Sequence, residues 1–253
     1  GLAPRLREVS GAALAMHAAD ASLLGHHTAT DREGYAASWA RQLARLGAPE
    51  EVRSGEVMEL VRFGPHESLD VVLDDGTPLD LPGWDLRAVW TPGHTPGHLC
   101  FVDDTHELVF SGDHMLPRIS PNISTIPGEL PNPLHRYLLS LHATVGLPDG
   151  EVFPAHEYRF RGVASRAQAL LGHHEERLDE IADVVSRHPG STAWEVSTRI
   201  SWSRPFETMS PRLRRLAVRE TDAHLLVLAD RGVVTGCGTD PDRWTPAVAT
   251  PVR

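Results

Sequence analysis

Residues 91–98 read TPGHTPGH and directly follow an apolar segment, Leu86–Trp90. The apolar residues predict a buried strand, and the glycines and prolines after them end it in a tight loop. His94 is therefore expected on a loop at the end of a strand, where its ring can face a site. A histidine on a loop is by itself most often a solvated side chain, so its meaning depends on what other segments bring near it.

Two further segments repeat the pattern of an apolar strand that ends at a polar residue. Residues 110–114 read FSGDH and place Asp113 at a strand tip, and residues 152–156 read VFPAH and place His156 at another. In layered α/β folds, ligands gather where strands end. Imidazole nitrogen and carboxylate oxygen are donors that zinc accepts. The three segments together predict a metal site made of His94, Asp113 and His156.

The patterning of the chain changes near residue 160. Before it, short strands alternate with helices, which favours an α/β layered domain. Two strand hairpins are expected, one around Asp74-Asp75-Gly76 and one that joins residues 99–102 to 107–111. Helices are expected over residues 35–46, 164–188, 192–200 (with Ser191 as its cap) and 211–230, and a strand over 233–235. After residue 160 the expected order is therefore three helices followed by a strand, which is the element order of a winged-helix module.

Composition and charge narrow the classes of function. The chain has 253 residues, is 41% hydrophobic and carries a formal charge of −10, an ordinary globular mix. No apolar run approaches the roughly 18 residues of a membrane helix, and no signal peptide opens the chain, so we expect a cytoplasmic protein without a membrane partner. Residues 1–159 hold 11 Arg and 22 acidic residues, and residues 160–253 hold 13 Arg and 12 acidic residues. This balance argues against general affinity for nucleic acid.

The segments at 91–98, 110–114 and 154–158 together resemble the metallo-β-lactamase-fold hydrolases. In that superfamily the histidine of the first segment binds one metal, the aspartate of the second bridges two metals, and the late histidine binds the second metal. The resemblance carries these roles to His94, Asp113 and His156, and it implies an α/β fold of the αββα sandwich type. For His98 we expect a catalytic part beside Asp113, with a hydrogen bond to a metal ligand as the alternative.

The C-terminal part, with Gly172-His173-His174 and Ala223-His224-Leu225, resembles the winged-helix extension of the lactamase-beta-like endoribonucleases. The segment PAHEY at 154–158 is in turn similar to glyoxalase II-type enzymes. We therefore expect a hydrolase domain over residues 1–160 and a winged-helix-like domain over residues 161–253.

One departure from the family is large. Its His-x-His-x-Asp-His motif, the source of most metal ligands, is absent, and Gly1–Leu6 resembles the helix that follows it. We expect that a segment with this motif is missing upstream and that the first sheet is truncated; a metal-free relative is the alternative. His26, His27 and His66 lie too far along the chain to replace the motif. Two zinc ions are thus expected in the complete enzyme, and fewer or none in this chain, which should be inactive alone.

The resemblance implies hydrolysis by a zinc-activated hydroxide that attacks a carbonyl or phosphoryl centre. Similarity to glyoxalase II-type enzymes favours a small-molecule ester or thioester, and the winged-helix extension makes RNA the second choice. A hypothesis of another class is a non-catalytic winged-helix binding protein, in which a helix with Arg212, Arg215 and Arg219 contacts the partner. A homodimer is left open.

Overall fold

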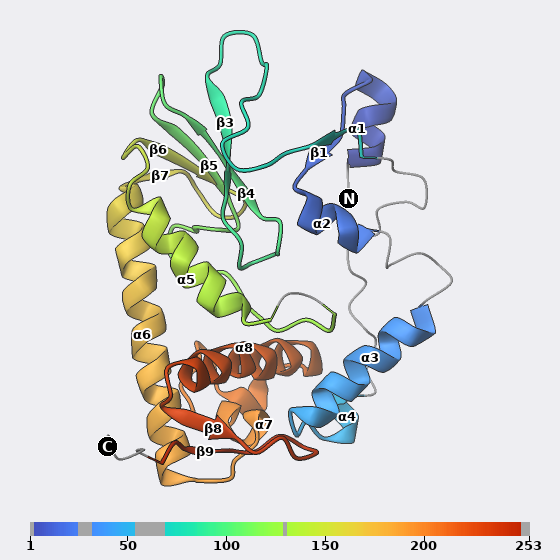
Figure 1. Ribbon diagram of the computed structural model, residues 1–253, viewed down its shortest axis with the longest axis vertical. Coiled ribbons are helices and arrows are strands. Elements are labelled where there is room, and N and C mark those ends of the chain that lie inside the picture. The colour runs from blue at the N-terminus through green and yellow to red at the C-terminus, as the bar shows by residue number, and fades with distance from the viewer. Residues whose placement is uncertain (1–2, 25–31, 54–68, 129–130, 249–253) are drawn as a thin grey trace, which may run out of the picture. The chain divides into compact units, whose positions relative to one another are not determined.

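The computed structural model describes residues 3–24, 32–53, 69–128 and 131–248, and it divides into two compact units (Figure 1). Unit 1 comprises Gly1–Tyr35, Glu59–Pro121 and His135–Leu171. Unit 2 comprises Ala36–Met58, Asn122–Leu134 and Gly172–Arg253. The sequence predicts two domains with a single boundary near residue 160. In the structure, each unit instead combines three separate segments of the chain.

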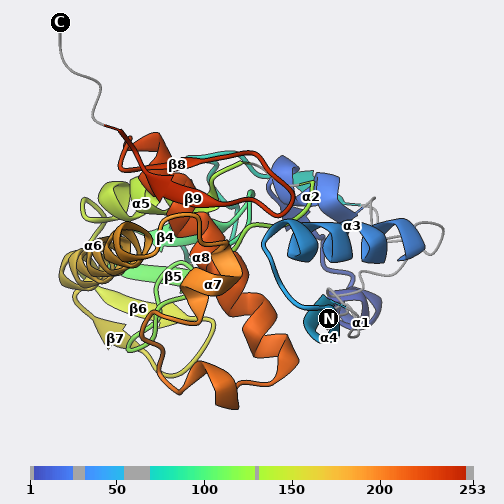
Figure 2. The same cartoon turned by 90° about the horizontal axis from the view of Figure 1, so that it is seen from below.

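A five-stranded mixed sheet forms the centre of unit 1. Its strands are β3 (Leu86–Trp90), β4 (Leu99–Asp103), β5 (Leu108–Gly112), β6 (Glu151–Pro154) and β7 (Phe160–Arg161). They pair in this order, with β5 and β6 parallel and the other neighbours antiparallel, and Figure 2 shows the order from β4 to β7. Along β4, Cys100 and Val102 are fully buried and alternate with Phe101, as the two-residue period of a strand requires. The predicted hairpin of 99–102 with 107–111 is confirmed.

The rest of unit 1 consists of helices and two short strands outside this sheet. They are α1 (Ala3–Ser10), β1 (Ala15–Met16), α2 (Ala18–Leu24), β2 (Val71–Val72), most of α5 (Pro133–Thr144) and the first turns of α6 (Val163–Arg187). The hairpin expected around Asp74-Asp75-Gly76 is wrong. Strand β2 pairs in parallel with β1, because the Asp70 carboxylate just before it accepts hydrogen bonds from the Leu14 backbone (2.8 Å) and from Arg7 (2.7 Å).

Unit 2 is mainly helical and ends in a two-stranded hairpin. It contains most of α3 (Arg32–Arg45), α4 (Glu50–Arg53), the rest of α6, α7 (Ala193–Ser197), a 3-10 turn (Phe206–Thr208), α8 (Pro211–Asp230), β8 (Val234–Gly236) and β9 (Trp244–Pro246). Helix α8 packs against α4, α7 and β8. The helices expected over 164–188 and 211–230 are confirmed. The order of three helices and a strand is also present, and the winged-helix assignment stays a prediction.

Helix α7 begins one residue later than predicted and ends earlier. The cap is Thr192 and not Ser191, and the helix stops at Ser197. Thr192 and Glu195 form a capping box, in which each side chain accepts a hydrogen bond from the other residue's backbone N–H. Ser191 instead donates its hydroxyl hydrogen bond to the His188 carbonyl.

No helix among the described residues combines the length and apolar character needed to cross a membrane.

Candidate metal site

The segment 91–98 is a compact loop that closes on itself. After β3, the Thr91 backbone N–H donates to the His98 carbonyl (2.9 Å), and the Gly93 N–H donates to the Thr95 carbonyl (3.0 Å). The Trp90 indole N–H donates to the Pro96 carbonyl (3.0 Å). These bonds give His94 a fixed backbone at the edge of the sheet, as the sequence predicted.

Asp20 holds this loop from the first turns of α2. Its Oδ2 accepts a hydrogen bond from the Thr95 hydroxyl, and its Oδ1 accepts one from the Gly97 backbone N–H, both at 2.6 Å. A Cβ atom on Gly97 would lie 2.6 Å from the Asp20 nitrogen, so the glycine is what lets the two segments approach. The loop that carries His94 is thus shaped by a carboxylate far from it in the sequence.

A bulge at the end of β5 directs Asp113. The pairing of β5 with β6 shifts register between Phe110 and Gly112, and Gly112 has a φ of 51°. A Cβ atom on Gly112 would lie 2.8 Å from His98 Nε2. Only glycine therefore meets both requirements here, the left-handed backbone and the close approach of the His98 ring.

Both ring nitrogens of His98 are engaged within the protein. Nε2 accepts a hydrogen bond from the Asp113 backbone N–H (3.1 Å), so the proton of the neutral ring lies on Nδ1, which donates to the Thr91 hydroxyl (2.8 Å). Burial, followed by the nearby charge of His94, lowers the pKa of His98 to about 4. His98 is thus a neutral group whose ring accepts a hydrogen bond from the backbone of Asp113, and its catalytic part stays a prediction.

His156 follows β6 at the other side of Asp113. Strand β6 ends at Pro154, and the next backbone N–H, of Ala155, donates to the Gly112 carbonyl (2.9 Å). This bond ties the loop of His156 to the loop of Asp113. The His156 side chain is 66% exposed, so it projects from the protein surface with little packing around it.

The structure brings these three predicted residues together on the carboxylate of Asp113. His94 Nε2 lies 3.6 Å from Oδ2, and His156 Nε2 lies 3.3 Å from Oδ1. Two ligands of one tetrahedral zinc, each bonded at about 2.0–2.1 Å, are about 3.3 Å apart. The donor types and both separations therefore fit a carboxylate that shares one metal with each histidine.

The described residues supply only part of such a centre. In these ranges no group of three or more His, Cys, Asp and Glu side chains is arranged to hold a metal ion. This agrees with the geometry above, in which each imidazole faces a different oxygen and forms a separate pair of donors. Catalytic zinc usually has three protein ligands. The three histidines weighed as replacements, His26, His27 and His66, lie outside the described residues.

His114, next to Asp113, is a buried structural group. Its Nε2 lies 2.7 Å from the Thr144 hydroxyl of α5, and the Tyr137 hydroxyl donates to its backbone carbonyl at 2.8 Å. Burial lowers the pKa of His114 to about 3, so its ring is neutral. These contacts attach α5 to the loop that carries Asp113.

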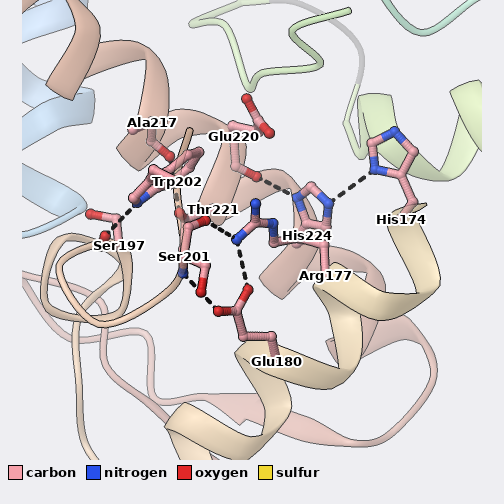
Figure 3. Close-up of polar contacts among 10 residues, drawn as sticks. All are labelled: His174, Arg177, Glu180, Ser197, Ser201, Trp202, Ala217, Glu220, Thr221 and His224. Atoms are coloured by element: carbon pink, nitrogen blue, oxygen red, sulfur yellow. Dashed lines mark hydrogen bonds and ion pairs between the residues drawn. The ribbon is translucent and has the colours of Figure 1, made fainter. Parts of the chain in front are cut away.

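A separate polar network lies within unit 2 (Figure 3). His224 Nδ1 donates to the Glu220 carbonyl (2.8 Å), which leaves its Nε2 to accept from His174 Nδ1 (3.1 Å). Arg177 pairs with Glu180 (2.7 Å), whose carboxylate also accepts from a backbone N–H of the 198–205 loop. Burial lowers the pKa of both histidines, so they are neutral and join α6 to α8. Their role here is packing between the two helices.

Sequence reasoning missed the residues that hold the ligand loops. Asp20 precedes its partners Thr95 and Gly97 by 75 and 77 positions, and Arg118 precedes its partner Glu157 by 39. Contacts over such distances leave no periodicity or motif in one sequence. The only local signal was the choice of Gly at position 97, which marks a close backbone approach.

The chain belongs to the metallo-beta-lactamase superfamily, whose family model matches residues 1–156. This is a family of hydrolases, and its members typically bind metal ions. The resemblance drawn from the three segments is therefore confirmed at the level of the family.

Solved structures support the same fold. A metallo-beta-lactamase family protein from Thermus thermophilus superposes with a TM-score of 0.80 at 29% identity, covering 97% of this chain and 75% of that one. A beta-lactamase domain protein from Burkholderia ambifaria superposes with a TM-score of 0.76 at 27% identity, covering 93% of this chain and 65% of that one. The expected α/β fold with a helical C-terminal region is confirmed.

Curated relatives match a shorter part. A lactamase-like protein of Neosartorya fischeri is 31% identical over 113 residues, which are 45% of this chain and 32% of that protein. An atrochrysone carboxyl ACP thioesterase of Aspergillus fumigatus is 27% identical over 144 residues, 53% of this chain and 32% of that protein. The chain thus matches about a third of the length of each of these two relatives.

Proposed function

We propose that this chain carries part of a dizinc hydrolytic site, in which His94, Asp113 and His156 are metal ligands. The observation that carries the proposal is the position of Asp113, whose two carboxylate oxygens each face one imidazole. A structural ion pair would need only one histidine. Here two histidines meet one carboxylate that is 28% exposed, an arrangement suited to two cations.

The residues around the ligands act by holding them. When bound, zinc supplies a Lewis acid that brings the pKa of a coordinated water to about 7. Asp113 would offset part of the metal charge with its two oxygens, and His98 would fix the backbone from which that carboxylate extends. Asp20 would keep the His94 loop in one conformation. In this proposal His98 is a positioning residue, and His94, Asp113 and His156 are the metal ligands.

We propose a carboxylic ester or thioester as the substrate. Two facts support this class over RNA. One relative carries the name of a thioesterase. The net charge is −10, and phosphate-rich substrates require clustered positive charge. A small-molecule substrate, a cytoplasmic location and a second copy of the chain as partner are further parts of this proposal. Membership of a hydrolase family favours it over the non-catalytic binding protein.

Zinc titration followed by a substrate panel tests the proposal. We expect the chain to take up fewer than two zinc ions, and H94A, D113N and H156A to weaken that uptake. The exposed residue Asp149 supplies the matched control D149N, which should leave it unchanged. The substrate panel uses the complete enzyme with zinc, because this chain holds only part of the site, and there thioesters should be cleaved in preference to RNA. Cleavage of RNA alone would replace the substrate class, and zinc uptake that is indifferent to D113N would remove the metal-site assignment.

A further inference from the structure

The backbone immediately after His156 is strained. Glu157 has a φ of 70°, in the left-handed region that residues other than glycine seldom adopt because of steric strain. Such a conformation persists only where neighbouring groups enforce it. His156 itself offers little enforcement, because its side chain is 66% exposed. The orientation of its imidazole therefore depends on what holds the backbone of this turn.

The Glu157 carboxylate is held by several donors of one segment. Arg118 donates to it from its backbone N–H (3.2 Å), from Nε (3.2 Å) and from Nη2 (3.0 Å). The Glu157 side chain is only 17% exposed. An exposed ion pair alone would contribute little, since Arg118 is 69% exposed. A carboxylate that receives side-chain and backbone donors of one residue together is a stronger and more directional anchor.

The segment that carries Arg118 is itself attached to a helix. Arg166 of α6 donates from Nε to the Leu116 carbonyl (2.6 Å) and from Nη2 to the Ile119 carbonyl (2.8 Å). These bonds fix the backbone on both sides of Arg118. A continuous path of hydrogen bonds therefore runs from α6 through residues 116–119 to Glu157, the residue next to His156.

We infer that Arg118 and Glu157 form a clamp that positions His156 toward Asp113. This Arg118–Glu157 clamp rests on the proposed function in one respect, that His156 is a metal ligand. The clamp offsets the strain at Glu157 and limits the turn 154–158 to the conformation in which His156 Nε2 lies 3.3 Å from Asp113 Oδ1. Arg118 and Glu157 are positioning residues and do not contact the metal.

Zinc affinity of the full chain tests the clamp. R118M and E157Q should each weaken zinc binding about 10-fold to 100-fold, the usual effect of losing a partner that orients a ligand. The double variant should lose no more than either single variant, because both remove the same interaction. The matched control is R159M. Arg159 is 65% exposed, directly follows the turn 154–158 and pairs with Glu151 at 3.5 Å. R159M should bind zinc like the unaltered chain.

Two further variants separate positioning from stability. In an H156A background, R118M should cause no additional loss of zinc affinity, because the residue that the clamp positions is gone. E157G should relieve the left-handed strain and keep or raise the melting temperature, yet weaken zinc binding as much as E157Q. An equal loss in R118M and R159M, or an undiminished effect of R118M in H156A, would overturn the clamp.

A measurement without metal keeps this outcome distinct from failure of the proposed function. Amide order parameters for residues 155–158 should be near 0.85 in the unaltered chain and fall toward 0.6 in R118M, but not in R159M. Unchanged order parameters in R118M would overturn the clamp whatever the zinc data show. Zinc binding that is insensitive to H156A, with order parameters that fall as expected, would instead remove the ligand role of His156 and leave the clamp as a device for loop rigidity.

Discussion

Single side chains decide the geometry of this site more than its strands do. Strand ends bring His94, Asp113 and His156 to one edge of the sheet, and a polar side chain holds the backbone near each of these candidate ligands. Asp20 serves the first loop, His98 the second and Glu157 the third. Each anchor satisfies backbone N–H groups or arginine donors that would otherwise have no fixed partner.

Replacement of Asp20 by Asn tests the anchor of the first loop. Asp20 accepts two hydrogen bonds of 2.6 Å, and the loss of its charge should lower the free energy of unfolding by about 1–3 kcal/mol. Urea unfolding measures this. D149N, at an exposed site, should change it by less than about 0.5 kcal/mol. Equal stability of D20N and D149N would show that the loop holds without the carboxylate.

At the scale of helices and strands, boundaries follow local chemistry. The capping box of α7 joins Thr192 and Glu195 through hydrogen bonds of 3.2 and 2.8 Å. T192A should therefore lower the free energy of unfolding by about 1 kcal/mol. S210A, at the cap of α8, should cost less, because its hydrogen bond to the Leu213 N–H is 3.4 Å long. Thermal unfolding of both variants ranks the caps, and T192S should restore most of the loss.

The sequence predicted those elements whose signals are local. Pro211 and Gly232 mark the ends of α8, and the two apolar runs on either side of Asp103-Asp104 mark the β4–β5 hairpin. The hairpin predicted for β2 was wrong, because this strand pairs with a parallel partner 56 residues upstream. The sequence also predicted the three ligand candidates, since each ends a strand, while the anchors of their loops depend on contacts that a single sequence does not display.

At the scale of the whole molecule, two carboxyl groups of α8 make stability depend on pH. Burial raises the pKa of Asp222 to about 6 and that of Glu220 to about 7, and hydrogen bonds from Thr125 and Asn122 oppose the shift only in part. Arg45, 3.7 Å from Asp222, and the nearby Asp242 are the other charges that act on it. Both acids therefore keep a proton in the folded protein at pH values where the unfolded chain has lost it.

The direction of the pH effect follows from these raised values. The stability that the two groups contribute is fully present below pH of about 4 and is lost as pH rises through about 6 to 7. For Asp222 the change is of the order of 3 kcal/mol, at about 1.4 kcal/mol for each pKa unit. Unfolding in urea at pH 4.5 and 7.5 should show a smaller difference in D222N than in D183N, a control at an exposed aspartate. Identical differences in the two variants would contradict the buried carboxyl.

The division of the chain into two units limits how the gene can recombine and where the polypeptide can be truncated. The polypeptide passes between its two units five times, near residues 35, 58, 121, 134 and 171. Each unit is made of three separate segments of the chain. Two crossovers in the gene therefore cannot transfer either unit as a whole into another gene. A cut near residue 160 would separate Leu43 and Leu46, which are buried in unit 2, from the helices α7 and α8 of that unit. Stop codons and fragment libraries should accordingly yield insoluble products from both sides of such a cut.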